Sequence, residues 1–226
     1  RIDLPYQTLQ AHMKIAVIAG TPVDTQMGVD LLKRKGAEGT GFPVSRTPEE
    51  QTAFQVGSQS AREEAVGAIL DQIKARGLER VLLYCNSLSA TIDAHALAEA
   101  RGLRVWTPMD VYGEIARKHR RVGVLAANCQ GAAGVERAMV NASPDTLVFG
   151  AANLRLVLGV EAGTPPEALV EDCGLETLLR FFEQNGAEEV VLGCTHFPYV
   201  KEALQGRTSL PVLDPAERLA ELVLAP

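Results

Sequence analysis

GLERVLLYCNS, residues 77–87, has a near copy further along the chain in GAEEVVLGCTH, residues 186–196. Each copy begins with Gly, carries a Glu, runs through an apolar segment and reaches a Cys that is followed by short polar residues. Three matches in one order and at nearly one spacing indicate an internal duplication. The other two matching pairs are KIAVIAG (14–20) with RVGVLAA (121–127), and GLRVWTP (102–108) with SLPVLDP (209–215).

Short apolar runs alternate with helix-length segments from Lys14 onward. Strands that alternate with helices form right-handed crossovers, so this order predicts parallel sheets covered by helices. The expected strands are 14–20, 80–84, 103–106, 121–126, 146–149, 188–192 and 210–213. The expected helices are 24–36, opened by Asp24, then 48–76, 88–100, 109–119, 131–140, 165–185, 198–205 and 215–223.

The duplication and the alternation together predict an α/β fold of two similar Rossmann-like, flavodoxin-like domains related by a pseudo-two-fold axis. The active site is expected in the cleft between them, because ligands in open α/β sheets bind at the carboxyl ends of the strands. The first domain is expected to comprise 14–106 plus 207–226, and the second 107–206. Residues 1–13 end in His12-Met13, a pair typical of a vector junction, and are interpreted as an expression-tag or linker remnant.

The composition narrows the class of protein. Lys and Arg total 22 against 28 Asp and Glu, and no block of like charge occurs, so nucleic acid is not an expected partner. The chain has no apolar stretch of membrane-spanning length and no secretory signal at its start, which predicts a cytoplasmic protein without a membrane partner. Its 4 cysteines are far apart and form no C-x-x-C motif, so reduced thiols are expected.

Cys85 and Cys194 end equivalent strands of the duplication. A single cysteine in such a place is more often a small buried apolar residue than a nucleophile, but the repeat favours a functional interpretation. Cys129 and Cys173 have no comparable polar neighbours, and buried packing is expected for both.

The two repeated cysteines are followed by polar pairs at the start of a helical segment. Side chains there could bind a carboxylate, and a helix N-terminus favours anions, including a thiolate. The pairs are Asn86-Ser87 and Thr195-His196.

A thiol with a pKa of about 8.5 is only a few per cent ionised at neutral pH, so reaction requires a proton partner. Asp24 and His196 are the candidates for the two thiols. Alternatives remain open: Asp24 could be a helix N-cap, and His196 a hydrogen-bonded histidine without a catalytic role. Cys194 and His196 could also be metal ligands, although two ligands at this spacing without a second pair make a poor zinc signature.

Two thiols on opposite faces of a carbon suit inversion by proton exchange, in which one thiolate removes the proton and the other thiol delivers one from behind. This scheme needs no cofactor. The chain has no Gly-rich dinucleotide motif, no P-loop and no obvious lysine for pyridoxal phosphate, which is consistent with it.

From about Lys14 to the C-terminus, the chain resembles the aspartate/glutamate racemase superfamily, and most closely its glutamate racemases. CNSLSA (85–90) is similar to that family's Cys-Asn-Thr-Ala-Ser-Ala segment, and GCTHFP (193–198) to its Gly-Cys-Thr-His-Tyr-Pro segment. DTQMG (24–28) resembles the Asp-Ser-Gly-x-Gly motif, and VEAG (160–163) a segment with a further acidic residue.

The resemblance implies a cofactor-independent racemase of an acidic amino acid, glutamate or aspartate, that acts as a homodimer. The implied acid and base are Cys85 and Cys194, assisted by Asp24 and His196. No metal is implied. The implied substrate-binding residues are Thr25, Asn86, Ser87, Thr195 and Glu161.

The chain departs from the glutamate racemase pattern at Val44-Ser45, which follow Pro43 where the family has Pro-Tyr-Gly. Val44 and Ser45 are therefore candidate contacts to the substrate side chain, and recognition of that side chain is expected to differ. Two alternatives stay open. One is another reaction of the superfamily: hydantoin racemisation, decarboxylation or cis-trans isomerisation. The other is a non-catalytic ligand-binding relative.

Overall fold

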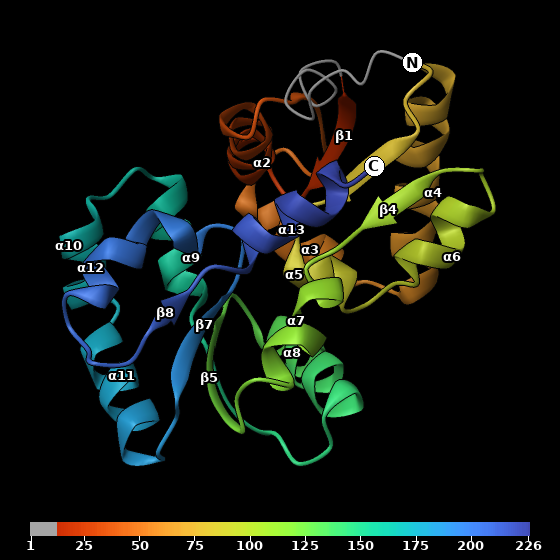
Figure 1. Ribbon diagram of the computed structural model, residues 1–226. Helices are drawn as coiled ribbons and strands as arrows, with labels where there is room; N and C mark the ends of the chain where they lie inside the picture. The colour runs from red at the N-terminus through yellow and green to blue at the C-terminus, as the bar shows by residue number, and fades with distance from the viewer. Residues whose placement is uncertain (1–12) are drawn as a thin grey trace. The chain divides into compact units, whose positions relative to one another are not determined.

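The computed structural model of the protein describes residues 13–226 and divides into two compact units (Figure 1). Unit 1 contains the chain up to Cys85 together with Ile92–Thr107 and Ala216–Pro226. Unit 2 contains Asn86–Thr91 and Pro108–Pro215. The expected tag remnant lies outside the described residues except for Met13.

Unit 1 is built on a four-stranded parallel sheet with the strand order β2-β1-β3-β4. Apart from Lys14 and Arg80 at their amino ends, the central strands β1 and β3 are apolar on both faces and buried, as expected for a parallel sheet covered by helices. The strands are β1 (Lys14–Ala19), β2 (Glu38–Pro43), β3 (Arg80–Leu83) and β4 (Arg104–Trp106). The helices are α2 (Pro22–Arg34), α3 (Pro48–Val56), α4 (Gln59–Ala75), α6 (Ala94–Glu99) and α13 (Pro215–Leu224), of which Pro215 falls in unit 2.

Unit 2 repeats this topology, with the strand order β6-β5-β7-β8 and all pairs parallel. Figure 1 shows α9 to α12 on one face of this sheet and α7 and α8 on the other. The strands are β5 (Arg121–Ala126), β6 (Leu147–Ala152), β7 (Glu189–Gly193) and β8 (Val212–Leu213). The helical elements are α5 (Asn86–Ser89), α7 (Met109–Ala116), α8 (Cys129–Ala142), α9 (Leu154–Glu161), α10 (Pro166–Asp172), α11 (Leu175–Gln184), the 3-10 helix η1 (Phe197–Val200) and α12 (Lys201–Gln205).

The two units therefore share one strand order, and the α/β fold expected from the duplication is confirmed. In each unit the cysteine of the repeated segment follows the third strand, β3 or β7, at its carboxyl end. The same edge of each sheet thus presents one thiol.

Two elements, β2 and α9, were not expected from the sequence, and both affect the site. Strand β2 has the sequence EGTGFP, whose two glycines and proline are poor strand formers, and it is an edge strand whose pairing with β1 defines it. Helix α9 lies between the expected strand 146–149 and the expected helix 165–185, where no element was expected. It begins at the Asn153 cap, which accepts from Leu156 N, and buries Leu156, Val157 and Val160.

Several expected helices are divided; 88–100, for example, becomes α5 and α6. The segment 48–76 breaks at Gly57, whose backbone is extended, and Ser58 then caps α4. Buried Arg62 donates to the carbonyl of Gln55 at 2.9 Å and to that of Gly57, which satisfies oxygens that the break leaves free. The segment 165–185 breaks at Gly174, where φ is 64° and only glycine is unstrained.

The domain bounds also differ from expectation in two segments, 86–91 and 207–215. Residues 207–215 were assigned to the first domain, but β8 pairs with β7, so the chain up to Pro215 belongs to unit 2. The segment Asn86–Thr91 likewise belongs to unit 2 because it packs on α8. A Cβ on Gly134 would lie 2.1 Å from Ala90 Cβ, so glycine permits this contact.

Two cysteines are more accessible than expected. Cys129 is exposed at the first position of α8, and Cys173 is half-buried at the end of α10. Partial burial raises the pKa of the Cys173 thiol. All four cysteines have free thiols.

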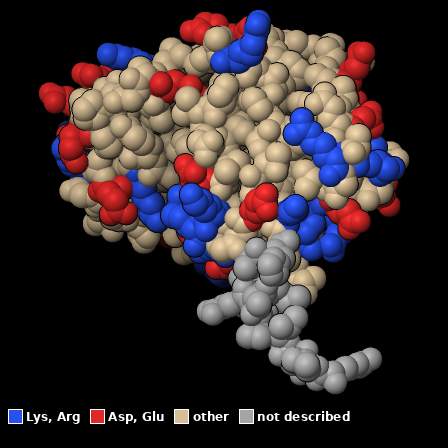
Figure 2. Space-filling model, turned by 90° about the horizontal axis from the view of Figure 1, so that it is seen from above, with Lys and Arg blue, Asp and Glu red and all other residues tan. Residues whose placement is uncertain are grey.

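Charged groups of both signs are interspersed on the face shown in Figure 2. Elsewhere and irrespective of this view, several charged side chains form ion pairs with close neighbours, such as Arg46 with Glu50 and Arg101 with Asp71. Among residues 13–226, no helix combines the length and the apolar character needed to cross a membrane.

Glu189 is a buried acid at the amino end of β7, the edge opposite Cys194. Its side chain is 1% exposed, and its Oε2 lies 3.1 Å from Nε2 of His119. Its Oε1 has no hydrogen-bond partner among the described residues. Burial, followed by the neighbouring Glu188 carboxylate, raises the pKa of Glu189 from 4.5 to about 7, and Lys118 opposes the shift.

We expect Glu189→Gln to be more favourable to stability at about pH 8 than at about pH 5. A carboxyl whose pKa is raised by folding contributes stability below its unfolded pKa, and this contribution is lost as the pH rises through the folded value. The loss falls between pH 4.5 and about 7 and amounts to at most about 3 kcal/mol. Thermal unfolding of the wild type and of Glu189→Gln at about pH 5 and about pH 8 measures this loss of stability. An equal difference in Tm at both would contradict this prediction.

Candidate active site

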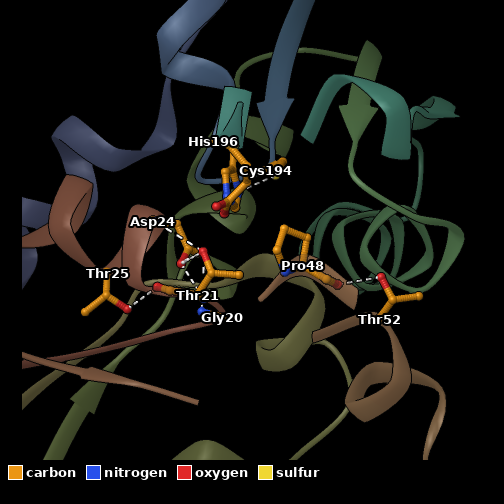
Figure 3. Close-up of polar contacts among 9 residues, drawn as sticks. Gly20, Thr21, Asp24, Thr25, Pro48, Thr52, Cys194 and His196 are labelled. Atoms are coloured by element: carbon orange, nitrogen blue, oxygen red, sulfur yellow. Dashed lines mark hydrogen bonds and ion pairs between the residues drawn. The ribbon is translucent and has the colours of Figure 1, made fainter. Parts of the chain in front are cut away.

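Asp24 is fixed in the first turn of α2, at the carboxyl end of β1. Thr21 is the N-cap of this helix, so the helix opens before Asp24, which is the third helical residue and completes a capping box. The Asp24 Oδ1 accepts from the Thr21 N at 2.7 Å and from its Oγ1 at 3.2 Å, and Oδ2 accepts from Gly20 N at 3.2 Å. Figure 3 shows the carboxylate beside Gly20 and Thr21. The expectation that Asp24 opens this helix as its N-cap is therefore wrong, because Thr21 is the N-cap and Asp24 is the third helical residue.

Gly20 lies at the centre of the residues predicted for this half of the site. Val44 N donates to Ala19 O and Ser45 N donates to Gly20 O, both at 2.9 Å, so strand pairing continues past β2. On the other side of β1, Ile18 pairs with Leu83, and Cys85 follows two residues beyond this pair, at the same edge of the sheet. These unit 1 residues therefore converge on one sheet edge, and Cys85 is 6% exposed.

Thr25 is held within the first turn of α2. Its hydroxyl donates to the Thr21 carbonyl oxygen at 2.6 Å (Figure 3). Its methyl group faces β2, where a Cβ on Gly41 would lie 2.8 Å from Thr25 Cγ2. The structure thus gives Thr25 a packing role, and contact with substrate stays a prediction.

Cys194, His196 and Glu161 form a chain of polar contacts in unit 2. The Cys194 Sγ lies 3.7 Å from the His196 Nδ1, as drawn in Figure 3, and the His196 Nε2 lies 2.6 Å from the Glu161 Oε1. Cys194 and His196 follow β7, whereas Glu161 is the last residue of α9. All three are largely buried: the side chains of His196 and Glu161 are 6% and 11% exposed.

This chain of contacts favours one proton arrangement. A carboxylate accepts a hydrogen bond, so Glu161 holds the proton of His196 on Nε2 and leaves Nδ1 as an acceptor facing the thiol. Nδ1 can then take the proton of Cys194. The geometry provides a thiol with an oriented proton acceptor, as nucleophile and base sites require.

Asn86 and Ser87 lie in α5, which unit 2 supports from two helices. The Tyr112 hydroxyl, fully buried in α7, donates a hydrogen bond to Asn86 Oδ1. This bond uses the oxygen of the Asn86 amide, so the N–H donors of the amide take no part in the contact with Tyr112. A Cβ on Gly131 of α8 would lie 3.6 Å from the Ser87 Cβ, so α8 packs directly beneath this segment.

Thr195, the remaining residue predicted for the site, is buried. It lies between Cys194 and His196 in the sequence. Within residues 13–226 no three His, Cys, Asp or Glu side chains gather in a way that could hold a metal ion.

Sequence reasoning did not find two residues of these clusters, Tyr112 and Gln51. Tyr112 belongs to an amphipathic helix, whose pattern predicts an ordinary core residue at this position. Gln51 of α3 bonds to Ser45 through its Oε1, which accepts from the Ser45 Oγ at 3.1 Å. Neither residue carries a local motif, and only the pairing of β2 with β1 brings Gln51 to the sheet edge.

The fold and these clusters define a class: proteins of two like α/β units, each with a thiol at the carboxyl end of its third strand. The model of the Asp/Glu/Hydantoin racemase family matches residues 40–223. The chain belongs to this family, and the resemblance noted from the cysteine segments is confirmed.

Two curated relatives are glutamate racemases. That of Acidothermus cellulolyticus is 29% identical over 139 residues, which cover 61% of this chain and 52% of the relative. That of Mycobacterium leprae is 29% identical over 141 residues, covering 61% of this chain and 51% of the relative. The chain thus spans about half the length of the curated relatives it matches.

Solved structures with the same fold include racemases of different substrates. Francisella tularensis glutamate racemase in complex with D-glutamate has a TM-score of 0.75 at 16% identity, covering 94% of this chain and 80% of that one. The allantoin racemase of Klebsiella pneumoniae has a TM-score of 0.66 at 16% identity and covers 93% of this chain and 86% of that one. At these identities the likeness concerns the fold.

Proposed function

We propose that this protein is a cofactor-independent racemase that interconverts the L and D enantiomers of an acidic amino acid, glutamate or aspartate. The observation that carries the proposal is the contact chain Cys194, His196, Glu161 at the end of β7. The duplication supports it, because Cys85 ends the equivalent strand β3 of unit 1. Membership of the family agrees with this chemistry.

In the proposed reaction, one thiolate takes the α-proton and becomes a thiol, while the C–H electron pair remains on the α-carbon. The other thiol donates its proton to the opposite face of that carbon and becomes a thiolate. Cys85 and Cys194 exchange these roles when the opposite enantiomer is bound. His196 returns Cys194 to the required protonation state through Nδ1, which lies 3.7 Å from Sγ.

Asp24 is proposed to assist Cys85, by analogy with His196. Its carboxylate is anchored by backbone N–H groups of Gly20 and Thr21, and such bonds favour its charged form. A fixed negative charge in this place could accept a proton or hold the substrate ammonium group. Thr195 and Ser87 would supply hydroxyl donors to carboxylate oxygens.

A second candidate substrate is a hydantoin or a related cyclic ureide. Val44-Ser45 favours it, because these residues replace the segment that the glutamate racemases carry at this point. A carbonyl group could accept hydrogen bonds from the same donors as a carboxylate.

Incubation of each enantiomer of glutamate, aspartate and a monosubstituted hydantoin, with chiral separation of the products, tests the proposal. We expect glutamate or aspartate to racemise in both directions without an added cofactor. Turnover of the hydantoin alone would favour the second candidate, and conversion of none of the three would contradict the proposed function.

A further inference from the structure

The side chain of Gln51 lies across Gly20, at the carboxyl end of β1. A Cβ on Gly20 would lie 2.9 Å from the Gln51 Cδ and 3.0 Å from its Nε2. A side chain at position 20 would therefore displace the amide, and glycine is required for this contact. Gln51 lies in the first turn of α3, the helix that follows β2 in the chain.

The Gln51 amide uses one of its two ends in a hydrogen bond. Its Oε1 accepts from the Ser45 hydroxyl at 3.1 Å. Its Nε2 is buried and has no hydrogen-bond partner among the described residues. A buried donor without a partner is rare in folded proteins and calls for a ligand or another explanation.

This unused donor lies next to the groups predicted to act on the substrate. The backbone N of Gly20 donates to Asp24 Oδ2 at 3.2 Å, so Asp24 and Gln51 both contact Gly20. Cys85 follows β3, which pairs with β1, at the same edge of the sheet. A small molecule that reaches the Cys85 thiol would meet the Gln51 amide at the same sheet edge.

We propose that Gln51 is a specificity-determining residue whose Nε2 donates a hydrogen bond to an acceptor oxygen of the substrate. For a substrate with an acidic side chain, which rests on the proposed function, that oxygen belongs to a carboxylate. An N–H donor binds a carboxylate or carbonyl oxygen and rejects an ammonium group. Ser45 acts as a positioning residue, because its hydroxyl directs the amide nitrogen away from itself.

Replacement of Gln51 with Met tests this role, because Met fills a similar volume and has no donor. We expect KM for the acidic amino acid to rise about 10- to 100-fold, the cost of losing a hydrogen bond to a charged group, with a smaller change in kcat. Gln51→Glu should raise KM further, since a carboxylate would face the substrate's own carboxylate. Thr52→Val is the matched control: Thr52 is the next residue of α3, and its hydroxyl donates to the Pro48 carbonyl (Figure 3). Its KM should stay within about twofold of the wild-type value.

Calorimetric Kd values for glutamate and aspartate separate this inference from the proposed function. If the wild type binds either one without racemising it and Gln51→Met loses that binding, the role of Gln51 stands and the racemase proposal fails. If racemisation is normal and Gln51→Met changes neither Kd nor KM by more than about twofold, the role of Gln51 is wrong. A wild type that binds neither amino acid contradicts both.

Two further variants apply if Gln51→Met does not unfold cooperatively. Ser45→Ala releases the amide, and Gly20→Ala displaces it, without a change at Gln51 itself. Both should weaken binding of the acidic amino acid. Wild-type Kd in both folded variants would overturn the proposal.

Discussion

Replacing either Cys85 or Cys194 with alanine is expected to lower racemisation by about 10³-fold or more. Each thiol is proposed to carry one of the two proton transfers, and a positioned acid or base contributes about 10² to 10⁴ in rate. Both side chains are buried at the carboxyl ends of equivalent strands, β3 and β7. Chiral separation of products over a wide range of enzyme concentrations measures the residual rate.

The chain supplies its own control cysteines. Cys129 is exposed at the start of α8, and Cys173 follows α10, away from the ends of β3 and β7 in sequence. Cys129→Ala and Cys173→Ala should racemise within about twofold of the wild type. If the two control variants lose as much activity as Cys85→Ala and Cys194→Ala, general thiol loss and not proton transfer explains the effect.

Replacing Glu161 with glutamine is expected to lower kcat by about 10²-fold. The carboxylate accepts the Nε2 proton of His196 at 2.6 Å and so leaves Nδ1 free to accept from the Cys194 thiol. A glutamine can donate its own N–H to Nε2, which would move the imidazole proton to Nδ1 and block that acceptor. The volume of the side chain is unchanged, so packing should be preserved.

The matched control for this change is Glu167→Gln, on α10. Glu167 is an exposed carboxylate that pairs with Arg207 at 2.7 Å, outside the contact chain. The pH dependence of kcat distinguishes a proton-transfer role from a structural one, because only the former should change the profile. Equal kcat values and equal profiles for Glu161→Gln and Glu167→Gln would contradict the role of Glu161.

The strands that carry the thiols were predictable from sequence because they are fully buried. The apolar runs of β3 and β7 need no alternation, and the duplication identified them as equivalents. Asp24 was placed correctly after β1, but its capping box was not foreseen, because the N-cap is Thr21.

The parts that sequence reasoning missed depend on contacts between distant segments. Strand β2 has glycines at positions 39 and 41 and becomes a strand only through its pairing with β1. That pairing brings Ser45 to Gly20 and so positions Gln51. Helix α9 also has an internal glycine, Gly159, which Leu169 of α10 approaches closely: a Cβ there would lie 2.2 Å from Leu169 Cδ2. A glycine that serves close packing therefore lies inside a helix that was not expected from the sequence.

The most direct test of the two-thiol account is hydrogen exchange at the α-carbon in deuterated water, with each enantiomer given separately to the Cys85→Ala and Cys194→Ala variants. Each variant retains one of the two thiols proposed to transfer protons. It should exchange only the enantiomer whose α-hydrogen faces that thiol, without racemising it. The account therefore predicts that the two variants exchange opposite enantiomers. Exchange of the same enantiomer by both variants, or of both enantiomers by either, would contradict it.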